Sequence, residues 1–176
     1  MQSGRAWIAV LALVGGWVAA GAPSLAEPQR ARMLESFRDW TVYVAEGDGG
    51  RICYIASEPK KQEGNYSRRG PTAVVVAKFP GDAGIQVSVQ AGYPYKRGSL
   101  VEMVIDQKLR FDLVTDAENA FARNAKEDRT IIEAMKKGAR MTVRGTSRKG
   151  TYSLDRYSLM GFTAAYRAML EACKDG

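Results

Sequence analysis

Two cysteines have the most obvious capacity for chemistry in this chain, and three roles are open to them. Cys53 lies in the stretch RICYIAS, and Cys173 lies close to the C-terminus. A thiol can act as a nucleophile, bind a metal or form a disulfide, and the first two roles usually need histidine partners. The chain has no histidine, and the wide spacing of the cysteines does not fit a CxxC redox motif. A disulfide is therefore favoured, provided that the chain enters an oxidising compartment.

The absence of histidine also argues against enzyme activity in general. It removes the commonest general base, the Ser-His and Cys-His pairs, and nearly every catalytic zinc arrangement. Two cysteines without histidine partners do not make a structural zinc site either. We expect no catalytic residue, no metal site and no cofactor.

One motif resembles a nucleotide-binding loop. The stretch GTSRKGT, residues 145–151, has the glycine spacing of a P-loop, but Thr151 stands where the motif requires lysine. The residues on both sides alternate as strands do, whereas a P-loop leads into a helix. We interpret the stretch as the loop of a β-hairpin.

Acidic residues offer the one alternative route to catalysis. Two carboxylates can drive glycosidic hydrolysis, and four lie near one another in the sequence: Asp106, Asp112, Asp116 and Glu118. Nothing in their spacing forces two of them together, and Asp106 fits the first position of a short turn. A histidine-free, carboxylate-based hydrolase or lyase that acts on a cell-envelope polymer is therefore kept only as the alternative function.

The N-terminus has the features of a secretory signal peptide. Residues 1–5 carry a basic charge, residues 6–20 form an apolar run, and small residues stand at Ser24 and Ala26. The run is shorter than the roughly 20 residues that a membrane-spanning helix needs. We expect residues 1–26 to be cleaved and the mature chain to be exported, to the periplasm or the outer membrane, without a transmembrane segment. In that oxidising space Cys53 and Cys173 should pair.

The mature chain has the periodicity of a mainly β protein. The run IQVSVQAG alternates Ile85, Val87 and Val89 with polar residues, and similar short runs recur between turn signals. The polar segment KKQEGNYSRRGP, residues 60–71, is expected to be an exposed loop. We assign residues 27–36 to an N-terminal linker and residues 37–176 to a single domain.

Two segments change to a helical period. Residues 117–138 place Ile131, Ile132 and Met135 on one face, and Gly138 is a natural C-terminal stop. The C-terminal segment carries one continuous apolar stripe: Phe162, Ala165, Tyr166, Met169, Leu170 and Cys173. The fold class that these patterns predict is an antiparallel β-sandwich with an inserted helix and a C-terminal helix.

The chain is basic, with a formal net charge of +7, and most of its basic doublets lie in predicted loops. The doublets are Lys60-Lys61, Arg68-Arg69, Lys96-Arg97, Lys136-Lys137 and Arg148-Lys149. Clustered on one face, they would attract anionic lipopolysaccharide or acidic lipid; scattered, they would only keep the protein in solution. Scatter is our default expectation. No nucleic-acid partner is expected, because the exported chain lacks a recognition motif.

The loop YPYKRGS, residues 93–99, is the best single candidate for a contact surface. Tyr93 and Tyr95 offer rigid amphipathic area beside Lys96 and Arg97. The alternative is a turn shaped by proline, with both tyrosines folded over the core. The partner would be an envelope protein or an anionic envelope component.

Five stretches in order resemble the invasion-associated locus B family of exported proteobacterial proteins. They are FRDWTVYV, CYIASEPKK, GYPYKRGS, MTVRGTSRKGT and YSLMGFTAAYRAMLEAC. The resemblance runs from Phe37 to Cys173 and implies an immunoglobulin-like β-sandwich in the periplasm or at the outer membrane. It supplies no catalytic residues. Founding members are linked to entry of a pathogen into host red cells, but many relatives resemble proteins of free-living bacteria, so the resemblance implies a general envelope role before an invasion role. Together with the lack of catalytic residues and the basic doublets, it predicts a non-enzymatic envelope module that binds a surface component.

Overall fold

The computed structural model describes residues 31–47, 49–81 and 84–174, which form eleven strands and two helices. The first strands are β1 (Arg32–Phe37), β2 (Trp40–Gly47), β3 (Gly50–Ser57), β4 (Lys61–Gly64), β5 (Ala73–Lys78) and β6 (Ile85–Gln90). The others are β7 (Leu100–Ile105), β8 (Leu109–Asp116), β9 (Asn119–Phe121), β10 (Arg140–Thr146) and β11 (Tyr152–Ser158). The helices are α1 (Ala125–Lys137) and α2 (Phe162–Ala172). The expected signal peptide, residues 1–26, lies outside the described residues.

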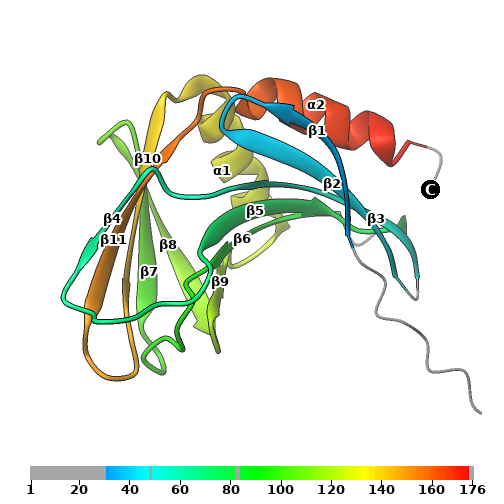
Figure 1. Ribbon diagram of the computed structural model, residues 1–176. Helices are drawn as coiled ribbons and strands as arrows, with labels where there is room; N and C mark the ends of the chain where they lie inside the picture. Colours follow the sequence, from blue (N-terminus) through cyan, green and yellow to red (C-terminus); the bar gives the residue numbers. More distant parts are fainter. Residues whose placement is uncertain (1–30, 48, 82–83, 175–176) are drawn as a thin grey trace, which may run out of the picture.

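All eleven strands belong to one antiparallel sheet, in the order β1-β2-β3-β5-β6-β9-β8-β7-β10-β11-β4. The prediction of a mainly β protein with an inserted and a C-terminal helix is thereby confirmed. The two separate sheets of an immunoglobulin-like sandwich are not confirmed, because the short strand β9 pairs with both β6 and β8 and joins the two halves. The sheet bends strongly: in Figure 1, β2, β3, β5 and β6 run across the picture, whereas β7, β8, β10 and β11 run from top to bottom beside them.

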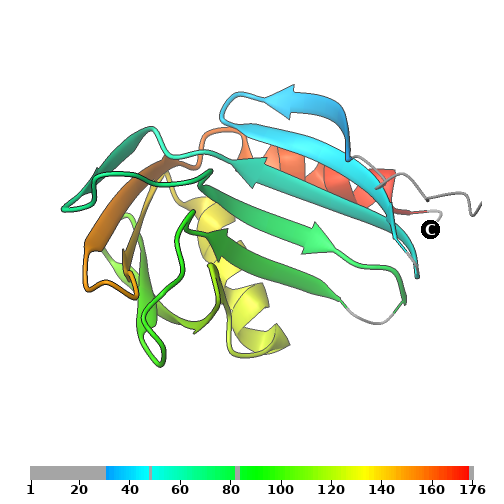
Figure 2. The same cartoon turned by 60° about the horizontal axis from the view of Figure 1, so that its bottom comes forward.

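Both helices cover one face of the sheet, as Figure 2 shows. Helix α1 packs on β6, α2 packs on β1, β2 and β3, and the helices contact each other. The core between helices and sheet includes Trp40, whose ring meets Phe162 edge-on with centroids 4.9 Å apart. Its indole Nε1 donates to the carbonyl oxygen of Ser158 over 3.0 Å, so the one polar atom of this buried ring is satisfied.

Helix α1 forms where the sequence predicts a helical period. Asn124 caps its start, because its Oδ1 accepts hydrogen bonds from the backbone N–H groups of Lys126 and Glu127. The predicted apolar face is confirmed, since Ile131, Ile132 and Met135 are buried.

Helix α2 is held to the sheet by its apolar stripe and by a covalent bond. Phe162, Ala165, Tyr166 and Met169 are buried, while Leu170 is partly exposed at the stripe's margin. Just beyond the helix, Cys173 forms a disulfide with Cys53 on β3. The last turn of the chain is thus fixed to an early strand.

Three strands escaped the sequence analysis, and each is short or polar. Residues 32–36, which we assigned to the linker, form most of β1 and pair with β2. Residues 61–64 lie in the expected loop but form β4, which pairs with β11 at the opposite edge of the sheet. Residues 119–121, which we read as part of a helical segment, form β9. The edge strands β1 and β4 carry no buried alternating face, and β9 has only three residues, so pattern alone does not reveal them.

Candidate functional site

Three loops that are far apart in the sequence meet at one end of the sheet: residues 65–70, 92–98 and 147–151. We call them the loop cluster. Backbone hydrogen bonds join them directly: Gly70 N to Gly92 O (2.8 Å), Lys96 N to Thr146 O (2.9 Å) and Arg148 N to Pro94 O (2.9 Å). The turn between β8 and β9 supports the middle loop, because Tyr95 N donates to the carbonyl oxygen of Ala117.

A buried ion pair anchors the first loop to β11. The guanidinium of Arg69 donates two hydrogen bonds to the carboxylate of Asp155, at 2.5 and 2.6 Å, and the side chains are only 4% and 1% exposed. Arg69 Nε also donates to the carbonyl oxygen of Ala91 at 2.6 Å. Burial acts to lower the pKa of Arg69, but the hydrogen bonds and charge of Asp155 outweigh it and raise that pKa, so Arg69 stays charged.

Two tyrosines flank the guanidinium of Arg69. Its central carbon lies 5.4 Å from the ring centroid of Tyr66 and 5.2 Å from that of Tyr93, which are cation–π distances. The hydroxyl of Tyr93 lies 2.6 Å from Ser153 Oγ on β11. Burial raises the pKa of Tyr93, so the phenol remains neutral at physiological pH. Arg69 therefore holds both rings, and β11 holds Tyr93 as well.

Glycines allow the loops to approach this closely. A Cβ atom on Gly145 would lie 2.5 Å from Tyr95 Cε1, and one on Gly92 would lie 2.4 Å from the carbonyl oxygen of Gly70. Gly92 also has a φ of 70°, in the left-handed region that favours glycine. A larger residue at either position would separate the loops.

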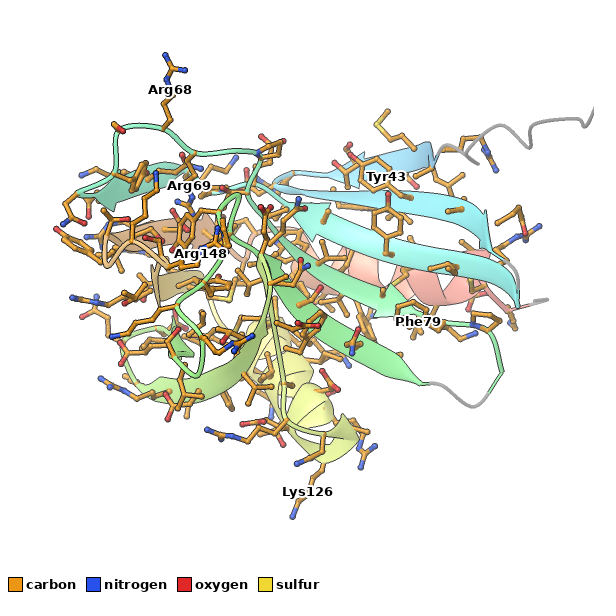
Figure 3. All side chains as sticks on the ribbon, turned by 90° about the horizontal axis from the view of Figure 1, so that it is seen from below. Tyr43, Arg68, Arg69, Phe79, Lys126 and Arg148 are labelled. Carbon is orange, nitrogen blue, oxygen red and sulfur yellow. A yellow bond between two sulfur atoms is a disulfide. The ribbon has the colours of Figure 1, made fainter. Side chains whose placement is uncertain are left out.

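The loop cluster lines an open cavity of about 360 Å³. Tyr66 and Tyr93 contribute its aromatic walls, and the exposed residues Arg68, Arg148 and Lys149 line it as well. Glu118 is its one acidic lining residue among those that the structure describes. In Figure 3, Arg68 extends away from its loop, whereas Arg69 lies against the ribbon.

A second hollow of about 430 Å³ adjoins the cavity and shares Pro94 and Arg148 with it. Arg97 and Asp116 line this hollow. The two hollows together extend the site along the middle loop.

The basic doublets are less scattered than we expected, because three of the five meet in the loop cluster. These are Arg68-Arg69, Lys96-Arg97 and Arg148-Lys149. Apart from the buried Arg69, none of their side chains forms an ion pair with another described residue. Elsewhere, Lys60, Lys61 and Lys136 each contact a carboxylate. The unneutralised positive charge of the doublets is therefore concentrated at the loop cluster.

The predicted contact residues lie in different environments. Tyr95 is only 6% exposed and packs in the core, so its ring is removed from the contact surface that we predicted. Tyr93 is partly buried and walls the cavity, while Lys96 and Arg97 are exposed. The tyrosines fold inward because Tyr95 fills the space above Gly145.

The P-loop-like stretch is a hairpin loop between β10 and β11, as predicted. Ser147 Oγ accepts hydrogen bonds from the backbone N–H groups of Lys149 and Thr151, both at 3.2 Å. These bonds close the loop on itself and leave the side chains of Arg148 and Lys149 exposed.

The structure does not bring all four acidic residues together. Asp106 lies in the turn between β7 and β8, whereas Asp116 is the last residue of β8, and Asp106 accepts hydrogen bonds from the backbone N–H groups of Ala139 and Arg140. In the described part of the chain, no group of three or more potential ligand residues could hold a metal ion. The arrangement of the acidic residues thus gives no support to the hydrolase or lyase alternative.

No helix among the described residues is long and apolar enough to cross a membrane.

The sequence analysis missed two residues that build the site, Tyr66 and Asp155, and it identified Arg69 only as part of an exposed basic doublet. One signal for Asp155 was available, because Ser153, Asp155 and Tyr157 occupy every second position of β11 and share its inward face. A charge at an inward position needs a buried partner. The sequence does not say which cation supplies it.

Comparison with known proteins gives one match. The family described as Invasion associated locus B (IalB) protein matches residues 40–170. The matched region runs from the start of β2 into α2 and includes the whole loop cluster. No curated protein and no solved structure matches the chain significantly.

Proposed function

The chain belongs to the invasion-associated locus B family, and on this premise we propose that it is a non-enzymatic binding module of the bacterial cell envelope. The family consists of exported bacterial proteins and is not a known enzyme family. The proposed partner is an anionic envelope component, and the proposed contact surface is the loop cluster. The link to host-cell invasion comes from the family description alone, and the proposed binding of an envelope component does not depend on it.

The observation that carries this proposal is the concentration of unpaired cations around one preformed cavity. Arg68, Arg148 and Lys149 line it, and Lys96 and Arg97 extend the positive surface along the middle loop. Like charges grouped on one face add their potentials, which draws anionic partners and raises association rates. Buried Arg69 contributes little to this field, because Asp155 neutralises it.

Retention on lipid vesicles tests the proposal. We expect the protein to bind vesicles that contain phosphatidylglycerol and not vesicles of phosphatidylcholine. Retention should fall as salt rises to physiological strength, because the Debye length shortens to about 8 Å. Replacing Arg148→Glu together with Lys149→Glu should weaken binding about 30-fold or more at low salt, since each cation near an anionic surface contributes about 1 kcal/mol.

Helix α1 offers a matched control. Lys126 and Arg129 are exposed there and form no ion pair with another described residue. Figure 3 shows Lys126 far from Arg68 and Arg148. Lys126→Glu with Arg129→Glu changes the net charge by the same amount and should leave retention within about twofold of the wild type. Equal loss in both variants, or no retention at low salt, would contradict the proposal.

A further inference from the structure

We propose that the cavity of the loop cluster binds a sugar that carries an anionic group, either a phosphate or a carboxylate. This inference rests on the proposed function and names the chemistry that the site recognises.

The size and walls of the cavity suit one sugar ring. A volume of about 360 Å³ falls in the range of small-molecule sites. The rings of Tyr66 and Tyr93 offer flat apolar area, against which the C–H face of a pyranose can pack. Because Arg69 lies at cation–π distance from both rings, this area is ordered before a ligand arrives.

The polar lining favours a ligand that has hydroxyl groups as well as an anion. Arg68, Arg148 and Lys149 can donate to a phosphate or carboxylate. Glu118 only accepts hydrogen bonds when it is ionised, so it repels a bare anion but can accept from a sugar hydroxyl. An anion without hydroxyl groups would use the three cations and leave Glu118 without a partner.

Neutral side chains add donors for sugar oxygens. Asn65 Oδ1 already accepts from the backbone N–H of Tyr152 at 2.7 Å, so the amide NH₂ of Asn65 is left to donate into the cavity that it lines. Ser67 lies beside it in the lining. Amide and hydroxyl groups of this kind are the usual partners of hydroxyl-rich ligands.

The site is also rigid. The Arg69–Asp155 pair, the Gly70–Gly92 backbone hydrogen bond and the internal bonds of Ser147 hold the three loops in place. A preformed site loses less entropy on binding, which favours a small ligand that buries little area.

Calorimetric titration of the disulfide-bonded protein tests this inference. The probes are glucose 6-phosphate, galacturonate, glucose and inorganic phosphate. We expect both acidic sugars to bind saturably, and glucose 6-phosphate to bind at least tenfold more tightly than either glucose or inorganic phosphate. The cavity would not be a sugar-binding site if inorganic phosphate bound as tightly as glucose 6-phosphate, or if neither acidic sugar bound.

Two exposed positions separate the contributions of charge and hydroxyl groups. Arg148→Ala should weaken the binding of glucose 6-phosphate at least fivefold and leave the affinity for glucose unchanged. Glu118→Gln should reduce the preference for glucose 6-phosphate over inorganic phosphate. Lys126→Ala is the control and should change neither the affinity for glucose 6-phosphate nor its preference over inorganic phosphate. If Arg148→Ala had no effect while the protein stayed folded, the sugar would bind elsewhere and the assignment would be wrong.

Competition experiments identify the source of the sugar. If glucose 6-phosphate displaces the protein from vesicles that contain lipopolysaccharide with a phosphorylated core, the source is lipopolysaccharide. Direct binding without displacement indicates a free acidic sugar, and both results support the inference. Salt-sensitive retention on phosphatidylglycerol vesicles without any sugar binding would overturn the inference and leave the proposed function intact.

Discussion

The two ends of the sheet are held by different physical means. At the helix end, where α2 covers β1, β2 and β3, an apolar stripe and the Cys53–Cys173 disulfide join the elements. At the loop cluster, the buried Arg69–Asp155 pair and backbone hydrogen bonds join them. Apolar burial is strong but tolerant of small shifts, whereas hydrogen bonds specify positions. The helix end is thus suited to stability, and the loop cluster is suited to recognition.

The comparison also explains where the free charge lies. Arg69 gives its hydrogen bonds to Asp155 and Ala91, so it positions the loop and is not available to a partner. Its neighbour Arg68 is exposed and lines the cavity. Of two adjacent arginines, one is structural and the other is free to bind.

Removing the disulfide should have the largest effect on stability. The bond closes a loop of 120 residues, and the chain-entropy model gives a stabilisation of about 4 to 5 kcal/mol for such a loop. The variant Cys53→Ala with Cys173→Ala should lose about this much free energy of unfolding in urea. Its retention on anionic vesicles should be unchanged wherever it is still folded. A loss below about 1 kcal/mol, or a loss of binding in the folded variant, would contradict the division between the two ends.

Breaking the buried ion pair should cost nearly as much and should also reduce binding. Asp155→Asn leaves the charge of Arg69 buried without its counterion, which typically costs about 3 to 5 kcal/mol. Urea unfolding measures the loss of stability, and vesicle retention measures how far displacement of the loop weakens binding. We expect both to fall.

A double variant sharpens this prediction. Arg69→Met with Asp155→Leu removes both charges, and such apolar replacements are often neutral for stability. We expect it to regain most of the stability lost in Asp155→Asn but not the binding, because the loop is no longer held by directed hydrogen bonds. A double variant that is as unstable as Asp155→Asn would show that uncompensated charge is not the cause.

Asp128 should produce a smaller, pH-dependent effect on the helix side of the molecule. This residue of α1 accepts a hydrogen bond from the backbone N–H of Val87 at 2.7 Å. Burial raises the pKa of Asp128 above 3.8 and outweighs the hydrogen bond from Val87, which lowers it. The folded state therefore binds the proton more tightly than the unfolded state does. This contribution to stability is fully present below pH 3.8 and is lost as pH rises through the raised pKa.

Two substitutions at this position separate charge from hydrogen bonding. Asp128→Asn keeps the acceptor but cannot titrate, so its stability relative to the wild type should increase as pH rises from 3 to 7. Asp128→Ala should be less stable than the wild type by about 1 to 3 kcal/mol at low pH, because it leaves the Val87 N–H without a partner. This deficit should shrink as pH rises, because alanine does not titrate while the wild type loses the contribution of protonated Asp128. Urea unfolding at several pH values distinguishes them. A constant difference between Asp128→Asn and wild type would contradict the raised pKa.

Much of the fold could be predicted because its signals are local. The stripe from Phe162 to Met169 defines α2 without any knowledge of its neighbours, and the alternation of Ile85, Val87 and Val89 defines β6 in the same way. The single sheet could not be predicted, because it depends on β9, a strand of three residues that pairs on both sides. Pairing of so short a segment is decided by its neighbours in space.

The loop cluster could be predicted only in part, for the same reason. Tyr93, Lys96 and Arg97 were identified from one basic and aromatic loop. Their proximity to Arg68 and Arg148 depends on how β4, β10 and β11 are arranged at the edge of the sheet. The inward turn of Tyr95 depends on Gly145, which is distant in the sequence and leaves room for the ring. Contacts between distant loops leave no periodic pattern.

Hydrogen exchange on the protein bound to anionic vesicles shows which end of the sheet meets the partner. We expect added protection only in residues 65–70, 92–98 and 147–151, and we expect α2, β2 and β3 to exchange as they do in the free protein. Protection of the helix end, with unchanged exchange in the three loops, would contradict it.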